Sequence, residues 1–200
     1  SDVPLRSDTT NDLKIRLCSN LIDESGRIFG SVEIEKTDYF STRWTNEMSR
    51  FDLRDSFGNP LIRGIDYWRE NGGIRPLGKS GASNQIGIST LCITSDGYLV
   101  THLGGNQELG NNVLNGSGSG SLDWTDYDSI ASPDLTLKEL LVRGMERELK
   151  EELCAEVGAG KSKTFVTGYA RLLRRGGKPE FFGLTMLKQS GSELSQGERR

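Results

Sequence analysis

The segment Glu139–Leu153 reads ELLVRGMERELKEEL and forms the centre of the longest helical pattern in the sequence, Leu135–Glu156. The helix is predicted to start either at Ser132-Pro133 or, one turn later, at a capping box whose first residue is Thr136. At about 100° per residue, the apolar side chains gather on one stripe, which is expected to pack against the core. That stripe consists of Val142, Met145, Leu149 and Leu153.

A second stripe of the same helix is acidic and carries Glu148, Glu151 and Glu152, at spacings of three and four residues. These carboxylates could form a solvated face that the neighbouring Arg and Lys side chains neutralise. They could instead supply hard oxygen ligands to Mg²⁺ or a similar ion. Gly144 lies on the same stripe. A glycine inside a helix costs about 1 kcal/mol relative to alanine, so we expect a neighbouring group to need the room.

The spacing of the charged residues favours the metal-binding interpretation. Glu139 is followed, after seven residues, by Arg147-Glu148-Leu149-Lys150-Glu151-Glu152. This arrangement resembles the box of the Nudix hydrolase superfamily. The box reads Gly, five residues, Glu, seven residues, then Arg-Glu-aliphatic-any-Glu-Glu-any-Gly-aliphatic.

The resemblance implies an α/β fold, with an α/β/α sandwich around a mixed β-sheet. It implies a metal-dependent hydrolase that acts on a nucleoside diphosphate linked to another moiety. Carried over by position, Glu148, Glu151 and Glu152 would bind Mg²⁺ (or Mn²⁺), and Arg147 would pair with Glu139 to orient the loop and the helix. Metal ions suit this reaction because they screen the charge of a pyrophosphate and lower the pKa of a bound water. Which glutamate acts as general base stays open.

Both ends of the box depart from the family pattern. Pro133 stands where the box glycine is expected, and Cys154-Ala155 replaces the closing Gly-aliphatic pair. We therefore expect an insertion between the glycine-rich loop and the helix, and a helix that continues to about Val157. These departures motivate an alternative function, a Nudix-fold nucleotide-binding or sensing module with little or no turnover.

Strands are predicted on both sides of the box, and a glycine-rich run lies between them. The predicted strands are Leu13–Leu17, Ile28–Glu35, Gln85–Thr94, Tyr98–Leu103, Thr164–Leu173 and Glu180–Leu187. The run GSGSGS, Gly116–Ser121, is expected to be too flexible for a strand. We interpret residues 79–200 as a Nudix-like catalytic domain and residues 1–78 as a β-rich extension. Because only two clear strands follow the box, the sheet would need a further strand and helix, from the N-terminal strands or from residues beyond these.

Four residues outside the box are candidates for substrate contacts. Gly118 and Gly120 could cradle a phosphate with their backbone N–H groups, or belong to a flexible linker. Trp124 could stack on a base or anchor its own loop. Arg174 could reach a phosphate, although solvation at the surface is the commoner role. Cys154 is expected to be a small buried hydrophobe.

The composition limits the partners and the compartment. A net charge of −3 and a pI of about 5.4 argue against a strongly basic nucleic-acid binder and against a polybasic membrane face. No apolar run approaches the roughly 18 residues of a membrane-spanning helix. Three separated cysteines favour a reducing, cytoplasmic setting, and a single histidine argues against a Cys/His zinc site. We expect a nucleotide-derived small-molecule substrate, no membrane or nucleic-acid partner, and an assembly compatible with a homodimer.

Overall fold

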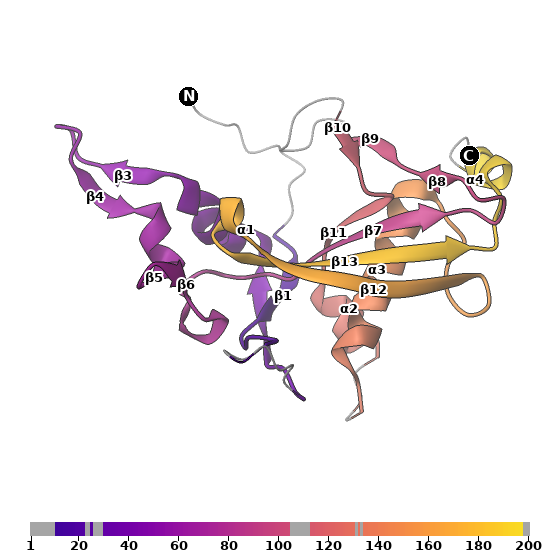
Figure 1. Ribbon diagram of the computed structural model, residues 1–200, viewed down its shortest axis with the longest axis horizontal. Helices are drawn as coiled ribbons and strands as arrows, with labels where there is room; N and C mark the ends of the chain where they lie inside the picture. The colour runs from indigo at the N-terminus through magenta and orange to yellow at the C-terminus, as the bar shows by residue number, and fades with distance from the viewer. Residues whose placement is uncertain are drawn as a thin grey trace. The chain divides into compact units, whose positions relative to one another are not determined.

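The computed structural model describes residues 11–22, 25, 30–104, 113–130, 132 and 134–197, and its elements belong to two compact units (Figure 1). The N-terminal unit contains residues 1–85 and 172–178. The C-terminal unit contains residues 86–171 and 179–200. The division therefore falls a few residues after the expected boundary at residue 78, and the turn at residues 172–178 groups with the N-terminal unit.

The N-terminal unit combines short strands with short helical turns. Strand β1 (Leu13–Leu17) pairs antiparallel with β2 (Ile34–Asp38). The first strand is as predicted, whereas the second begins later than expected, and part of its predicted range lies outside the described residues. The remaining elements are α1 (Tyr39–Thr42), η1 (Arg43–Glu47), η2 (Met48–Arg50), β3 (Asp52–Arg54), β4 (Pro60–Arg63), η3 (Gly64–Tyr67), β5 (Arg69–Glu70), β6 (Gly73–Ile74), η4 (Leu77–Lys79) and η5 (Leu173–Arg175).

Part of the interior of this unit is polar, and it contains a neutral cluster of amide and hydroxyl side chains as well as the buried charged residues Glu47 and Lys178. The side-chain amide of Asn46 donates to Asn84 Oδ1 at 3.2 Å, and the Asn84 backbone N–H donates to Asn46 Oδ1 at 2.8 Å. Both asparagines are fully buried. Beside them, the Thr42 hydroxyl donates to Gln85 Oε1 at 2.9 Å and lies 2.8 Å from the Ser83 hydroxyl. These neutral bonds give most polar groups of the cluster a partner, although Asn84 Nδ2 is buried without one among the described residues.

The C-terminal unit is built on a mixed sheet with the strand order β11-β7-β13-β12. Strand β7 pairs parallel with β13, and antiparallel with β11 and β8. The strands are β7 (Gly87–Ile93), β8 (Leu99–Val100), β11 (Gly118–Ser121), β12 (Ser162–Leu172) and β13 (Lys178–Leu187). A separate antiparallel pair contains β9 (His102–Gly104) and β10 (Val113–Asn115). The fold is therefore mixed α/β with a mixed sheet, which confirms the predicted α/β class and mixed sheet.

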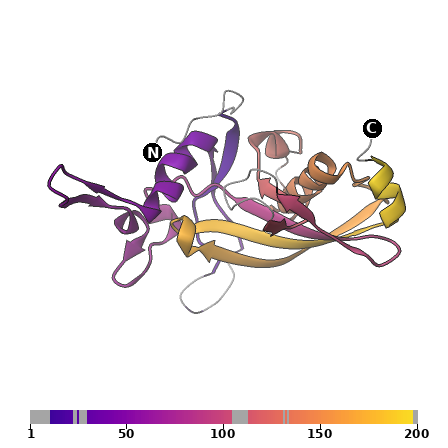
Figure 2. The same ribbon diagram turned by 90° about the horizontal axis from the view of Figure 1, so that it is seen from above.

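The helices of this unit lie on one face of the sheet (Figure 2). They are α2 (Trp124–Asp128), α3 (Leu137–Leu153) and α4 (Gly191–Gly197). Their common core contains Cys92, Leu149, Leu153, Ala155, Leu187 and Leu194. Side chains alternate along a strand, so Leu91, Phe182 and Met186 point to the opposite face, where all three are exposed. In the described part of this unit, no helix covers that face. No described helix is long and apolar enough to cross a membrane.

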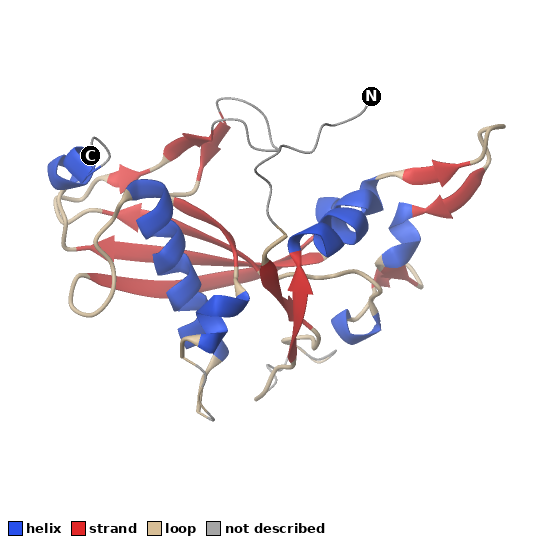
Figure 3. Cartoon of the chain, turned by 180° about the vertical axis from the view of Figure 1, so that it is seen from behind, coloured by secondary structure: helices blue, strands red, loops and turns tan. Residues whose placement is uncertain are grey.

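Helix α3 is the long blue helix in Figure 3. Its burial confirms the amphipathic pattern, with adjustments at both ends. Met145, Leu149 and Leu153 are buried as predicted, whereas Val142 is half-buried, and Leu140 and Leu141 join the buried face. The helix begins at the capping box rather than at the earlier alternative start.

The predicted continuation of α3 to residue 157 is wrong. The helix ends at Leu153 because Cys154 adopts a left-handed conformation, with φ 53°. This conformation turns the chain, so the Cys154 side chain is exposed, contrary to the prediction that it is buried. Ala155 enters the core in its place.

The glycine-rich run also contradicts its prediction, because Gly118–Ser121 forms strand β11 beside β7. A Cβ atom on Gly118 would lie 2.9 Å from the backbone nitrogen of Leu149. The missing side chains let α3 pack directly on the strand, and this packing holds the flexible sequence in an extended conformation. Gly144 serves the same purpose from the helix side, because a Cβ there would overlap Leu122 and lie 2.8 Å from Ile88 Cδ1.

Candidate active site on helix α3

The candidate site lies where α3 crosses β11. Glu148 is 8% exposed, and its carboxylate rests on Gly120, where any Cβ atom would overlap it. One turn later, Glu152 accepts a hydrogen bond of 3.0 Å from the Ser119 backbone N–H. Strand β11 therefore contacts both carboxylate-bearing turns of α3, through Gly118 and Gly120 at Glu148 and through Ser119 at Glu152. Their sequence-based assignment to a phosphate cradle remains untested.

Arg147 connects the acidic residues of the helix to the preceding segment. Its Nε and Nη2 donate to the two carboxylate oxygens of Asp126 at 3.0 and 3.1 Å. Nη2 also donates to the Ser121 carbonyl at 2.8 Å. Nη1 donates to Glu148 Oε1 at 2.9 Å and to Glu151 Oε2 at 3.1 Å. Every N–H group of the guanidinium is used in these bonds.

The predicted pairing of Arg147 with Glu139 is wrong. Glu139 instead accepts hydrogen bonds from the Thr136 backbone N–H and hydroxyl, at 2.9 and 2.7 Å, and so completes the capping box of α3. The N–H bond from Thr136 is the main cause of the lowered pKa of Glu139. Because the segment before the helix supplies Asp126, Arg147 has a different carboxylate partner. Glu139 lies outside the Arg147 network.

Burial makes two carboxyls of the site weaker acids than usual. Desolvation raises the pKa of Glu148 to about 7, although Arg147 acts in the opposite direction. Desolvation likewise raises the pKa of Glu152 to about 7, against the lowering effect of the Ser119 N–H. The charge of Glu151 raises the pKa of both groups further. Arg147 therefore offsets only part of the desolvation cost of a charged Glu148, and the Ser119 N–H offsets only part of that of Glu152.

The donor set fits a hard divalent cation. Among the described residues, no three His, Cys, Asp or Glu side chains are already grouped as a metal centre. The carboxylates of Glu148 and Glu151 both face the Arg147 guanidinium in this arrangement. Carboxylate oxygens are the ligands that Mg²⁺ prefers, and a bound cation would offset the desolvation and the smaller like-charge repulsion that raise the pKa of Glu148 and Glu152.

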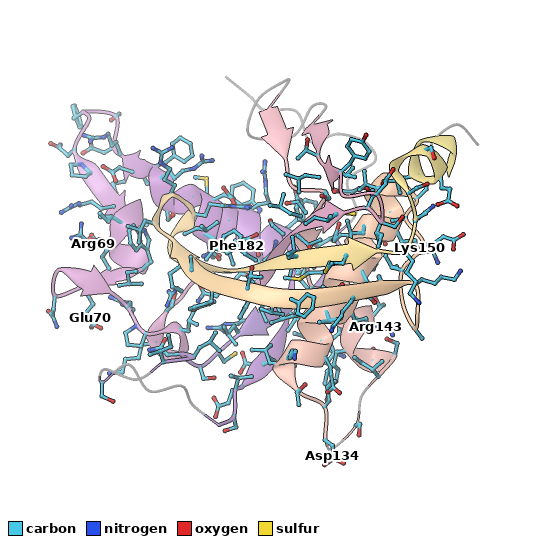
Figure 4. The ribbon with its side chains drawn as sticks, turned by 45° about the vertical axis from the view of Figure 1, so that its right-hand side comes forward. Arg69, Glu70, Asp134, Arg143, Lys150 and Phe182 are labelled. Carbon is cyan, nitrogen blue, oxygen red and sulfur yellow. The ribbon has the colours of Figure 1, made fainter. Side chains whose placement is uncertain are left out.

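The remaining predicted residues lie in different places. Trp124 begins α2, where its ring packs on Tyr127 with centroids 5.0 Å apart. Arg174 lies in η5, in the N-terminal unit. The basic residues Arg143 and Lys150, labelled on α3 in Figure 4, are exposed.

Asp126 is the functional candidate that sequence reasoning missed. It is 3% exposed and completes a capping box at the start of α2, in which Asp126 Oδ2 accepts from the Asp123 backbone N–H at 2.9 Å. The sequence signal was the spacing Asp123-Trp124-Thr125-Asp126, which is typical of a helix start. That signal predicts a cap but not its partner in α3.

No known family model matches the chain, and a comparison with curated proteins finds no match.

Proposed function

We propose that the chain is a metal-dependent hydrolase of a nucleoside diphosphate linked to another moiety, built on a Nudix-like fold. One observation carries the proposal: the carboxyls of Glu148 and Glu152 lie one helical turn apart, and burial raises the pKa of each to about 7. Strongly perturbed carboxyl pairs are concentrated at functional sites. An incompletely neutralised carboxylate pair beside a third carboxylate supports cation binding.

The end of the helix also supports the resemblance. Glycine commonly supplies the left-handed residue after a helix, and Cys154 adopts that conformation here. Ala155 then provides the buried apolar residue that the pattern places next. The departure from the family letters is therefore compatible with the family geometry. A complete α/β/α sandwich would require a further layer over the exposed apolar face of Leu91, Phe182 and Met186.

In this proposal Glu148, Glu151 and Glu152 hold Mg²⁺ (or Mn²⁺). When bound, the ion would screen the charge of the pyrophosphate and lower the pKa of a coordinated water. Arg147 fixes the Glu148 and Glu151 carboxylates through its two Nη1 bonds. A carboxyl with a pKa near neutrality is suited to accept a proton from the attacking water, a role that Glu148 or Glu152 could fill.

The test incubates the protein with a panel of nucleoside diphosphate derivatives, with and without Mg²⁺. Chromatography then measures the products. We expect release of the nucleoside monophosphate only when the metal is present. The free thiols Cys18, Cys92 and Cys154 fit the proposed cytoplasmic setting, so the assay buffer should be reducing.

A second candidate function is a nucleotide-binding or sensing module with little turnover. The observation that favours it is the Arg147 guanidinium, which already bonds two of the three carboxylates. Calorimetry separates the two functions. Saturable binding of a nucleoside diphosphate derivative without product formation supports the module, whereas metal-dependent product supports the hydrolase.

A further inference from the structure

We propose that Asp126 is a positioning residue of this site: it fixes the Arg147 guanidinium, which in turn orients the Glu148 and Glu151 carboxylates. The inference rests on the proposed function for its catalytic meaning, but the Asp126–Arg147 link can be tested separately. It assigns to the segment before α3 a role that the box pattern gives to Glu139.

The first argument is the geometry of the contact. Both oxygens of Asp126 meet the fork of Nε and Nη2, at 3.0 and 3.1 Å. Such a two-bond contact defines the plane of the guanidinium as well as its position. Asp126 is itself fixed, because it is 3% exposed and Oδ2 also accepts from the Asp123 backbone N–H. A buried, doubly held carboxylate is a rigid support.

The second argument is what the orientation accomplishes. With Nε and Nη2 held by Asp126 and the Ser121 carbonyl, Nη1 is the group left for the helix carboxylates. It bonds Glu148 and Glu151 together. Rotation of the guanidinium would break both bonds at once. The placement of two proposed ligands therefore depends on Asp126 through one intermediate side chain.

The third argument excludes the position that the box predicts. Glu139 is exposed to solvent, and its carboxylate accepts its hydrogen bonds from Thr136. Asp126 and Glu139 occupy equivalent capping-box positions in α2 and α3. Only Asp126 also holds Arg147.

The experiment compares Asp126→Asn with Glu193→Gln in the full chain. Glu193 accepts from the Ser190 backbone N–H at 2.7 Å at the start of α4, so its variant also converts a capping carboxylate into an amide, away from Arg147. Groups that orient metal ligands typically contribute about 10–100-fold to activity or metal affinity. We expect Asp126→Asn to lower kcat and the calorimetric Mg²⁺ affinity by about that factor, with KM for the nucleotide changed by less than about threefold. Glu193→Gln should change neither kcat nor Mg²⁺ affinity.

Two results would overturn the inference. One is a folded Asp126→Asn protein with wild-type kcat and Mg²⁺ affinity. The other is an equal loss in Glu193→Gln, which would attribute the effect to helix capping. Loss of kcat in Glu139→Gln, with kcat retained in Asp126→Asn, would return the role to Glu139.

If Asp126→Asn does not fold, Asp123→Asn takes its place. The Asp123 carboxylate lies 3.6 Å from Arg147 Nη2, and Asn caps helices as well as Asp. It should lower kcat and Mg²⁺ affinity in the same direction but by less, and wild-type values would count against the inference.

A double-mutant cycle distinguishes failure of this inference from failure of the proposed function. Asp126→Asn, Arg147→Lys and the double variant are unfolded in urea without metal or substrate. Coupling between the two sites supports the link, even if no substrate of the panel is hydrolysed; additive effects would show that the link is absent. An active wild-type protein with strong coupling but unchanged kcat in Asp126→Asn would leave the function standing and refute the positioning role.

Discussion

The neutral asparagine cluster of the N-terminal unit and the charged face of α3 bury hydrogen-bonding groups in different ways. Asn46 and Asn84 exchange two hydrogen bonds through neutral groups, although Asn84 Nδ2 is buried without a partner in the part of the chain that the structure describes, and Thr42, Ser83 and Gln85 form a neutral cluster beside them. On α3, the buried side of the helix carries Glu148 and Glu152, with Arg147 as the nearby cation.

The difference separates polar groups that stabilise packing from the carboxylates that we propose to bind a cation. A neutral, paired network stabilises and specifies packing at low electrostatic cost. Buried carboxylates without full compensation reduce stability, and such groups persist mainly where function needs them. The following changes are expected to act on one region and not on the other.

The largest effect is expected on activity, for Glu152→Gln. The substitution keeps the size of the side chain but removes one negative charge from the proposed metal site. Losing one such electrostatic contact typically lowers the rate by about 10²–10³-fold. The free energy of unfolding should stay level or rise slightly, because a repulsion with Glu148 one turn away disappears. Steady-state kinetics and urea unfolding measure the two quantities.

Lys150→Gln is the control for this variant, since Lys150 is exposed on the same helix (Figure 4) and should leave turnover nearly unchanged. Partial rescue of Glu152→Gln at high Mg²⁺ would place its defect in metal binding. Unchanged turnover with lost stability would instead identify Glu152 as a structural residue.

A smaller effect, on stability, is expected for Asn46→Ala. It leaves the Asn84 side-chain oxygen and backbone N–H without their buried partner. An unsatisfied buried polar group costs about 1–3 kcal/mol, so the free energy of unfolding should fall by roughly that amount. The loss should be the same at acidic and neutral pH, because no charge is involved. Asn59→Ala, which removes an exposed amide bond to Asp55, is the matched control and should cost less than about 0.5 kcal/mol. Equal losses in the two variants would show that the buried amide pair has no special importance.

A third effect is a pH dependence of the metal-free protein. The carboxyls of Glu148 and Glu152 have a pKa of about 7, against an ordinary value of 4.5. The folded state therefore holds these protons more tightly than the unfolded state. Their stabilising contribution is complete below the ordinary pKa and is lost as pH rises through about 7. Urea unfolding across this interval should show that the free energy of unfolding declines as pH rises, and that the decline is weaker in Glu152→Gln. A rise in stability attributable to Glu152 over the same interval would contradict the assigned shift.

The sequence was sufficient for the features that depend on local periodicity. The α3 core residues Met145, Leu149 and Leu153, the capping box at Thr136, and strand β7 all follow from spacing within one segment. The clustering of Glu148, Glu151 and Glu152 on one helix face follows for the same reason.

Features that depend on a distant partner were not predictable in this way. The GSGSGS run has low intrinsic strand propensity and becomes β11 because α3 packs on Gly118 and Gly120. The partner of Arg147 is Asp126, which lies in α2, outside the helical period of α3. The left-handed conformation of Cys154 allows Ala155 to reach the core, and periodicity carries no information on that turn.

The central claim is that the partly compensated charge of α3 is a cation site. The most direct measurement is the titration of the Glu148 and Glu152 side-chain carboxyls by NMR, in wild-type protein with and without Mg²⁺. Without metal, the account predicts a pKa of about 7 for both groups. With saturating Mg²⁺, it predicts that both are ionised well below that pH, because a bound cation favours the charged form. Carboxyls that titrate near 4.5, or whose pKa does not respond to Mg²⁺, would contradict it.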